Sequence, residues 1–420
     1  MKKGFSTIMS AQFFSSLADN ALFVAAVELL RSDGAPEWQR AALVPMFALF
    51  YVVLAPFVGA FADCIPKGKV MFVSNTIKVV GCLMMLFGTH PLAAYAIVGL
   101  GAAAYSPAKY GILTELLPPE KLVAANGWIE GTTVGSIILG TVLGGALISP
   151  TVSASLLSLD FPSMETGIDT PAESAILVIA AVYGLAALFN LRIPDTGARY
   201  AHQERNPLKL VVDFWHCLKV LWRDKLGQIS LAVTTLFWGA GATLQFIVLK
   251  WADVQLGMPL SRAAILQGVV ALGIAVGAVV AARFVPLKGS LRVLPFGVAM
   301  GVLVPMMTLV HTLPVAYATL VLIGGMAGFF VVPMNALLQH RGHVLMSAGH
   351  SIAVQNFNEN LMILAMLALY AVLIRADVHI NTVIVLFGSF VAVTMLGVIR
   401  LHRANQARFD SVALIGQSRH

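Results

Sequence analysis

Apolar residues recur along the whole chain in long runs that short polar segments separate. A helix needs about 20 apolar residues to cross a hydrocarbon core about 30 Å thick. Twelve segments approach or exceed that length, and we predict a membrane-spanning helix in each. In chain order these spans 1 to 12 cover residues 5–30, 41–62, 70–89, 91–116, 122–148, 173–193, 229–251, 263–285, 291–310, 313–338, 346–374 and 379–401. Continuous runs such as 175–191 lack the alternating polarity of a barrel strand, which excludes a β-barrel.

A long polar and basic segment divides the twelve spans into six and six. We therefore predict an N-terminal six-helix bundle at 1–193, a cytoplasmic linker at 194–228, a C-terminal six-helix bundle at 229–402 and a cytoplasmic tail at 403–420. Six is an even number, so both halves enter the membrane in the same sense, as the parallel repeats of major-facilitator transporters do. The predicted fold class is an all-α membrane protein with two parallel six-helix repeats.

Similar residues recur in the two halves at a roughly constant offset, which favours an internal duplication. The matched pairs, in chain order, are Asp19 with Gln245, residues 63–68 with 283–289, Pro107 and Lys109 with Pro333 and Asn335, and Asn126 and Glu130 with Asn356 and Glu359.

The composition excludes several classes of protein. Of the 420 residues, 58% are hydrophobic and only 11% are charged, whereas soluble domains carry roughly 25% charged residues. A soluble enzyme, a disordered chain and a nucleic-acid-binding protein are therefore all excluded. The three cysteines show no disulfide or metal spacing.

The net charge of +7 reflects membrane topology. With both termini in the cytoplasm, 20 of the 27 Lys and Arg lie on the inner side and four on the outer side, as the positive-inside rule requires. Anionic lipid of the inner leaflet is the expected neighbour of this basic surface. The segment 149–171, which carries Asp160, Glu165 and Asp169 but no Lys or Arg, is predicted to be an outer loop.

Polar residues inside the first-half spans are the first functional candidates, because a charge at mid-bilayer costs roughly 2.5–3.5 kcal/mol and usually meets a partner or an aqueous cavity. Asp19 and Asn20 lie near the middle of span 1. Lys109 lies in span 4 with Tyr105 four residues earlier on the same face. We predict that Asp19 and Lys109 pair when the site is empty and separate to bind a zwitterion.

The second group of candidates comes from spans 5, 7, 10 and 11. Glu130 follows Asn126 by four residues, and span 11 has five polar residues from Gln355 to Asn360, among them Asn356 and Glu359. These residues, with Gln245 and Asn335, are substrate-binding candidates that line the central cavity or a gate, or else they form a hydrogen-bond network between helices. Both interpretations stay open for Glu130 and Glu359.

Charged residues near the cytoplasmic ends of spans have simpler interpretations. Asp63 and Lys67 between spans 2 and 3 form a gating latch by charge contact or are topology signals only. Lys78, about two turns inside span 3, is expected to extend its ammonium to the membrane surface.

No catalytic or nucleotide-binding motif is present, so neither enzymatic activity nor a cofactor is expected. HExxH, GxSxG and Walker A sequences are all missing. Transport would therefore draw on gradients of substrate or ions.

Several strings resemble the bacterial lysophospholipid transporter family of the major facilitator superfamily. The resemblance covers roughly residues 5 to 402. The most specific string is the one at 101–113 in span 4; others stand at 18–22, 55–59 with Asp63, 125–127, 236–241, 328–339 and 352–356.

This resemblance implies inward flipping of lysophospholipids, chiefly lysophosphatidylethanolamine and lysophosphatidylglycerol, across the bacterial inner membrane by alternating access. It also implies a functional partner, an inner-face acyltransferase/acyl-carrier-protein synthetase that restores the missing acyl chain. Mapped onto this sequence, the head-group residues would be Asp19 and Lys109. We expect a monomer.

Three departures from the family pattern stand out. Relatives carry an arginine where this chain has Gln245, which offers hydrogen bonds but no charge to Asp19. Pro66 stands where a glycine is usual, and the segment 149–171 is longer than in those relatives.

Two other functions are compatible with these residues. A proton-coupled exporter of small amphipathic compounds would share the fold and use Asp19 or Glu359 as its proton site. A membrane-embedded sensor or scaffold without flux would share it too, since a fold alone does not choose among functions.

Overall fold

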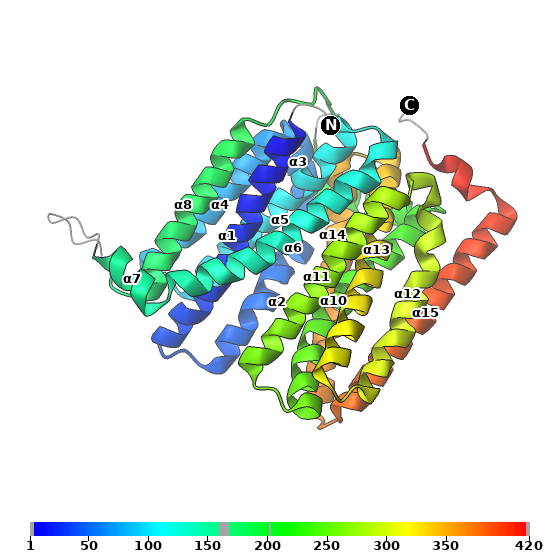
Figure 1. Ribbon diagram of the computed structural model, residues 1–420. Helices are drawn as coiled ribbons and strands as arrows, with labels where there is room; N and C mark the ends of the chain where they lie inside the picture. Colours follow the sequence, from blue (N-terminus) through cyan, green and yellow to red (C-terminus); the bar gives the residue numbers. More distant parts are fainter. Residues whose placement is uncertain (1–3, 159–167, 201–202, 417–420) are drawn as a thin grey trace. The chain divides into compact units, whose positions relative to one another are not determined.

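The computed structural model describes residues 4–158, 168–200 and 203–416, and this part of the chain is helical throughout without any strand (Figure 1). The fifteen α-helices are α1 Phe5–Ser32, α2 Glu37–Val53, α3 Ala55–Cys64, α4 Lys67–Leu86, α5 Pro91–Leu116, α6 Leu122–Leu147, α7 Pro150–Leu157, α8 Pro171–Leu191, α9 Pro207–Arg223, α10 Gly227–Leu256, α11 Leu260–Phe284, α12 Leu294–Leu303, α13 Leu313–Leu345, α14 Ala348–Arg375 and α15 Ile380–Arg408. The all-α prediction is confirmed.

Ten segments of the described chain are helical, long and apolar enough to cross a membrane. The bent pair formed by α2 and α3, which meet at 66° just before Pro56, makes an eleventh. The helix α5 has 26 residues, but tyrosines, Ser106 and Lys109 dilute its apolar character, and it falls outside this set. All twelve predicted spans thus coincide with helical segments.

Two compact units make up the chain. One contains Met1–Ile112 and Gly135–Val211, and the other contains Leu113–Val134 and Val212–His420. The first half of α6 therefore belongs to the second unit and its second half to the first.

In the first unit, α8 packs against both α1 and α4, as Figure 1 shows. A capping box fixes the start of α8, because the Thr170 hydroxyl accepts from the Glu173 amide and the Glu173 carboxylate accepts from the Thr170 amide. Gly140 and Gly144 of α6 lie directly against the backbone of α1, where a Cβ atom would meet the carbonyls of Leu17 and Ala21. Small residues thus let these helices approach closely.

In the second unit, the closest helix pair is α11 with α13. Gly273 and Gly277 of α11 face Gly324 and Gly328 of α13, where backbone meets backbone and no Cβ atom fits. The two G-x-x-x-G spacings therefore form a seam of the kind that packs helices in lipid.

Three segments differ from the sequence prediction. The linker contains a helix, α9, and the expected outer loop begins with α7. Span 9 has only ten α-helical residues, with 3₁₀ turns Leu287–Val293 before and Val304–Leu309 after them, because Pro286 and Pro305 interrupt regular hydrogen bonding. Lys2, Lys3, Asp160, Glu165 and Arg419 lie outside the described residues.

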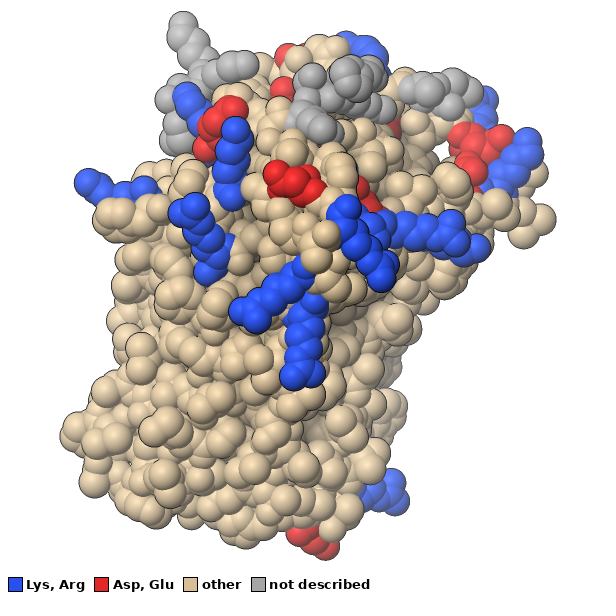
Figure 2. All heavy atoms as spheres, turned by 90° about the vertical axis from the view of Figure 1, so that its right-hand side faces the viewer, with Lys and Arg blue, Asp and Glu red and all other residues tan. Residues whose placement is uncertain are grey.

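Charged side chains are unevenly distributed on the face that Figure 2 shows. Lys and Arg gather toward one end, and much of the rest of that face is uncharged. Large apolar side chains such as Leu188, Val142 and Val393 are exposed on the helices. An exposed apolar surface of this extent is the surface that lipid covers.

Candidate functional site

A buried ion pair forms the centre of the polar cluster in the first unit. The Lys78 ammonium donates to both carboxylate oxygens of Asp19, at 2.8 and 2.9 Å. The Lys78 side chain is 1% exposed, whereas that of Asp19 is 25% exposed. The cation is therefore enclosed, and one edge of its carboxylate partner remains accessible.

Neighbouring side chains complete the surroundings of this pair. The Tyr183 hydroxyl of α8 donates to Asp19 Oδ1 at 2.6 Å. The Ser15 hydroxyl lies 3.1 Å from the Lys78 ammonium and donates to Asn75 Oδ1 at 2.8 Å. The rings of Tyr105 and Tyr183 lie 5.2 and 5.3 Å from the ammonium, within cation–π range. We call Ser15, Asp19, Asn75, Lys78 and Tyr183 the charged cluster.

The charged cluster corrects two sequence predictions. The prediction that Lys78 extends to the membrane surface is wrong, because its ammonium is held inside the unit by Asp19. The counter-charge that we expected from Lys109 is supplied by Lys78. A signal was present in the sequence: Ser74, Asn75 and Lys78 share one face of span 3, and such a polar face needs a polar partner in the membrane.

The other predicted residues of the first unit lie near this cluster or on the helix that borders it. Tyr105 is buried, and its ring contributes to the surroundings of Lys78. Asn20 turns back on its own helix and donates to the Ser16 carbonyl at 2.8 Å. The Lys109 ammonium lies 4.3 Å from the centre of the Tyr110 ring. Pro107 is accommodated inside α5, which continues through it.

The second unit has a cluster of a different chemical kind. The Gln355 amide of α14 donates to Glu359 Oε1 at 2.7 Å and to Asn335 Oδ1 of α13 at 3.1 Å. Thr234 of α10 also hydrogen-bonds to Glu359, and Glu130 lies close enough to act on it electrostatically. All of these side chains are buried.

One turn before Glu130, the second unit has a reciprocal amide pair. Asn126 donates to Gln339 Oε1, and Gln339 donates to Asn126 Oδ1, both at 2.9 Å. Asn356 is buried on α14, where its carbonyl accepts from Asn360. We call Asn126, Thr234, Asn335, Gln339, Gln355 and Glu359 the amide cluster. Thr234 was missed because it stands in an apolar run without a charge, and Gln339 because it lies just beyond the predicted end of span 10, before His340 and Arg341.

Gln245 stands apart from the amide cluster. It is exposed on α10, and its backbone carbonyl accepts from Gln267 Nε2 of α11 at 3.1 Å. The structure therefore gives its side chain no fixed partner in the described part of the chain.

The two predicted gating residues form a buried pair. The Lys67 ammonium lies 2.6 Å from Asp63 Oδ1 and 2.7 Å from the Ala62 carbonyl. The ring of Tyr200 lies 4.9 Å from the same ammonium, which places the start of the linker over the pair. The contact between Asp63 and Lys67 is present as predicted, while its role as a gate remains a prediction.

A second pair, which the sequence did not suggest, anchors the end of the linker in the second unit. Arg341 donates to both oxygens of Asp224, at 2.6 and 3.1 Å, and to the Leu414 carbonyl at 3.3 Å. Asp224 also accepts from the amide of Gly227 at the start of α10. This bidentate pair joins the linker, α13 and the C-terminal segment.

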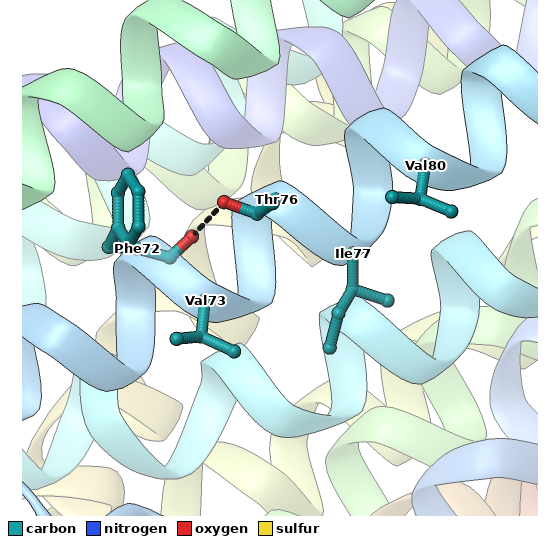
Figure 3. A pocket seen from close by; sticks show the side chains of 5 residues that line it. All are labelled: Phe72, Val73, Thr76, Ile77 and Val80. Carbon is teal, nitrogen blue, oxygen red and sulfur yellow. Dashed lines mark hydrogen bonds between the residues drawn. The ribbon is translucent and has the colours of Figure 1, made fainter.

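Two grooves on the first unit are lined by none of the residues of the two clusters or of the ion pairs described above. One, of about 210 Å³, runs along α4 past Phe72, Val73, Thr76, Ile77 and Val80 (Figure 3). The other, of about 530 Å³, lies between α4 and α8. Their only polar side chain, that of Thr76, is bonded to the Phe72 carbonyl. Such apolar grooves suit acyl chains of the surrounding lipid and lack the polar groups that fix a head group.

The described residues contain no group of His, Cys, Asp or Glu that suits a metal ion.

Comparison with known proteins decides the family. The sequence model of the Major Facilitator Superfamily matches residues 8–367. The Lysophospholipid transporter LplT of Yersinia enterocolitica is 43% identical over 381 residues, which cover 90% of this chain and 89% of that protein. The same transporter of Yersinia pestis is 42% identical over 89% of this chain and 88% of that protein. The chain belongs to the LplT family of the major facilitator superfamily.

Solved structures agree with the fold of this family. A bacterial transporter of the superfamily, FucP, in its outward conformation has a TM-score of 0.71 at 15% identity and covers 96% of this chain and 98% of its own. A bacterial homologue of the iron transporter ferroportin has the same TM-score at 14% identity, covering 97% of this chain and all of its own. The LplT-family chain is thus a multi-pass membrane transporter of the major facilitator fold.

Proposed function

We propose that this chain moves lysophospholipids, such as lysophosphatidylethanolamine and lysophosphatidylglycerol, inward across the bacterial inner membrane for re-acylation. The observation that supports it most strongly is the 42–43% identity, over about nine tenths of the chain, to proteins named lysophospholipid transporters. A lysolipid has a head group too polar to cross hydrocarbon unaided. Alternating access to the two sides of the membrane would carry that head group past the barrier.

Within the first unit, Asp19 is the proposed binding group for the head-group ammonium. Its carboxylate is held in place by Lys78 and Tyr183, and one edge remains exposed. An ethanolamine ammonium would add a charge-assisted hydrogen bond at that edge. Asn20, Tyr105 and Lys109 are proposed as its neighbours, with Lys109 toward the phosphate.

Within the second unit, Glu130, Gln245, Asn335, Asn356 and Glu359 are the proposed substrate-contacting residues. Exposed Gln245 has its side chain available for a ligand, while the amide cluster offers fixed donors and acceptors. Asp63 and Lys67 are proposed as gating residues, because breaking their buried contact would release the end of α3 from the start of α4.

We further propose the predicted topology and domain division for this chain. Both termini and the linker 194–228 lie in the cytoplasm, and the halves 1–193 and 229–402 are the two six-helix bundles. The functional partner is an acyltransferase/acyl-carrier-protein synthetase at the inner face, and the transporter is a monomer.

A second candidate function is proton-coupled export of small amphipathic compounds. It is favoured by Glu359, a buried carboxylate for which the described residues provide hydrogen bonds but no Lys, Arg or His partner. A carboxyl group in such a place can carry a proton.

Proteoliposomes distinguish the two candidates. Lysophosphatidylethanolamine is placed in the outer leaflet, and albumin extracts what has not moved inward. No pH gradient is imposed. We expect the extractable fraction of lysolipid to fall faster in vesicles with the protein than in protein-free vesicles. Equal rates with and without protein would contradict lysolipid transport, and efflux of an amphipathic cation that requires a pH gradient would support the second candidate.

A further inference from the structure

The linker helix α9, Pro207–Arg223, is the most amphipathic of the α-helices in the described chain. At 100° per residue its side chains divide into three faces. One face is buried, a second is apolar but exposed, and a third is polar.

The buried face attaches α9 to the second unit. Phe214, Leu218 and Leu221 are buried, and the Phe214 ring lies 5.3 Å from that of Phe357 on α14. The indole N–H of Trp222 donates to Asn358 Oδ1 at 3.2 Å. These contacts fix the rotation of the helix about its own axis.

The exposed apolar face is a stripe that one basic residue, Lys219, interrupts. Leu208, Val212, Trp215 and Trp222 follow one another at intervals of four, three and seven residues, so they lie on one side of the helix. Leu208 is 77% and Val212 is 66% exposed, and both tryptophans are exposed as well. The protein itself therefore leaves Leu208 and Val212 uncovered and covers the two tryptophans only in part.

Basic residues border the stripe. Lys219 lies within it, Arg223 lies on its polar side, and Lys225 follows the end of the helix. None of the three has an acidic partner in the described part of the chain. Lys209, on the polar face, differs because it pairs with Glu204 at 3.1 Å.

We propose that α9 lies on the inner leaflet, with the stripe of Leu208, Val212, Trp215 and Trp222 in the acyl boundary and Lys219, Arg223 and Lys225 on anionic phospholipid head groups. Tryptophan prefers this interface, and basic amphipathic helices bind there. The inference requires a membrane protein of the proposed orientation and does not require lysolipid transport.

Charge complementarity favours the leaflet over a protein partner. Three unpaired cations beside an apolar stripe need an occupant that is anionic at its surface and apolar just below, and a leaflet containing phosphatidylglycerol has this layering. A second copy of the chain would present the same three cations to its mate.

The experiment uses the full-length protein in lipid nanodiscs. In a variant without Cys64, Cys82 and Cys217, a spin label is attached at Val212→Cys or at Asp213→Cys. Both positions are exposed in the structure, but they lie on different faces of α9. Frequent collisions of the spin label with oxygen show that it lies in lipid, and frequent collisions with a water-soluble nickel complex show that it lies in water.

In discs containing phosphatidylglycerol we expect position 212 to favour oxygen and position 213 to favour the nickel complex. Replacing Lys219, Arg223 and Lys225 by Gln, or using discs of phosphatidylcholine alone, should shift position 212 toward water. The embedded state should weaken by roughly fivefold per lost charge, given the usual attraction of a basic side chain for an anionic leaflet. Lys209→Gln is the matched control and should have less effect.

Two outcomes would overturn the proposal. Equal access of the nickel complex to positions 212 and 213 in both lipids would place the stripe in water. Protection of position 212 from both reagents would place it against protein. Unchanged thermal stability of the labelled variants shows that the protein is still folded, so neither outcome can be attributed to misfolding.

Discussion

The charged cluster of the first unit and the amide cluster of the second satisfy buried polar groups in different ways. In the first, a lysine neutralises an aspartate, and a tyrosine and a serine complete the hydrogen bonds. In the second, amides bond to one another and to a carboxyl group. The comparison shows that the two units hold their buried polar groups by different chemistry, an ion pair in one and mainly neutral hydrogen bonds in the other.

The difference has an energetic consequence. Removing one member of a buried ion pair leaves the other charge uncompensated, which costs far more than the pair contributes when intact. Removing one member of an amide pair leaves a neutral group without one hydrogen bond. The charged cluster should therefore tolerate paired substitutions better than single ones, and the amide cluster should respond weakly to both.

The largest expected effect is that of Lys78→Met. The Asp19 carboxylate would lose its counter-ion, and we expect a loss of about 3–5 kcal/mol of stability, as for other broken buried pairs. The double variant Asp19→Asn with Lys78→Met should recover most of that loss. Thermal unfolding in detergent at a fixed scan rate measures it; a double variant as unstable as Lys78→Met would contradict the ion-pair interpretation.

The next effect belongs to the amide pair of Asn126 and Gln339. Each single alanine variant should cost about 1–2 kcal/mol, and the coupling energy from the double-variant cycle should lie near 1 kcal/mol, typical of hydrogen bonds between membrane helices. The same unfolding assay provides the comparison. A coupling energy as large as that of Asp19 with Lys78 would remove the distinction between the two clusters.

A smaller effect is expected for Glu359→Gln. The amide side chain retains an oxygen that accepts from Gln355, so stability should change by less than about 1 kcal/mol. Asp19→Asn is the informative reference, because it leaves Lys78 without a counter-ion and should cost more. Equal losses in the two variants would show that Glu359 has a charged partner.

The smallest effect concerns the linker, outside both clusters. The Arg199 guanidinium and, secondarily, the Gly197 amide lower the pKa of Asp195 to about 2. A lowered pKa stabilises the folded state above the ordinary value of 3.8, and this contribution disappears as the pH falls toward 2. Between pH 5 and 8, the slope of thermal stability against pH should therefore be the same for Asp195→Asn as for the unmodified chain.

Much of the fold could be predicted from the sequence. Long apolar runs determine helices in a membrane, so all twelve spans coincide with helical segments, and the positions of Asp63 and Lys67 four residues apart predicted their contact. The amphipathic helix α9 was missed because the prediction relied on continuous apolar runs. In α9, charged residues stand between the apolar ones, so no such run forms.

The partners within each cluster could not be predicted as well. Lys78 and Asp19 are 59 residues apart in the chain, and only the packing of α8 against both α1 and α4 brings them together with Tyr183. The position of each residue along its predicted span favoured Lys109 as the partner of Asp19. Gln339 shows the same limitation, because a neutral amide just beyond a predicted span has no signal that identifies its partner.

The most direct test of the central claim, that Asp19 binds the head-group ammonium, is the relative flipping rate of lysophosphatidylethanolamine and lysophosphatidylglycerol in proteoliposomes. The Asp19→Asn, Lys78→Met double variant is the one to compare with the unmodified chain, because it removes the carboxylate without leaving a buried charge. We expect the ethanolamine-to-glycerol ratio to fall by roughly tenfold, the equivalent of one charge-assisted hydrogen bond, while lysophosphatidylglycerol still moves. An unchanged ratio in a folded, active double variant would contradict the claim.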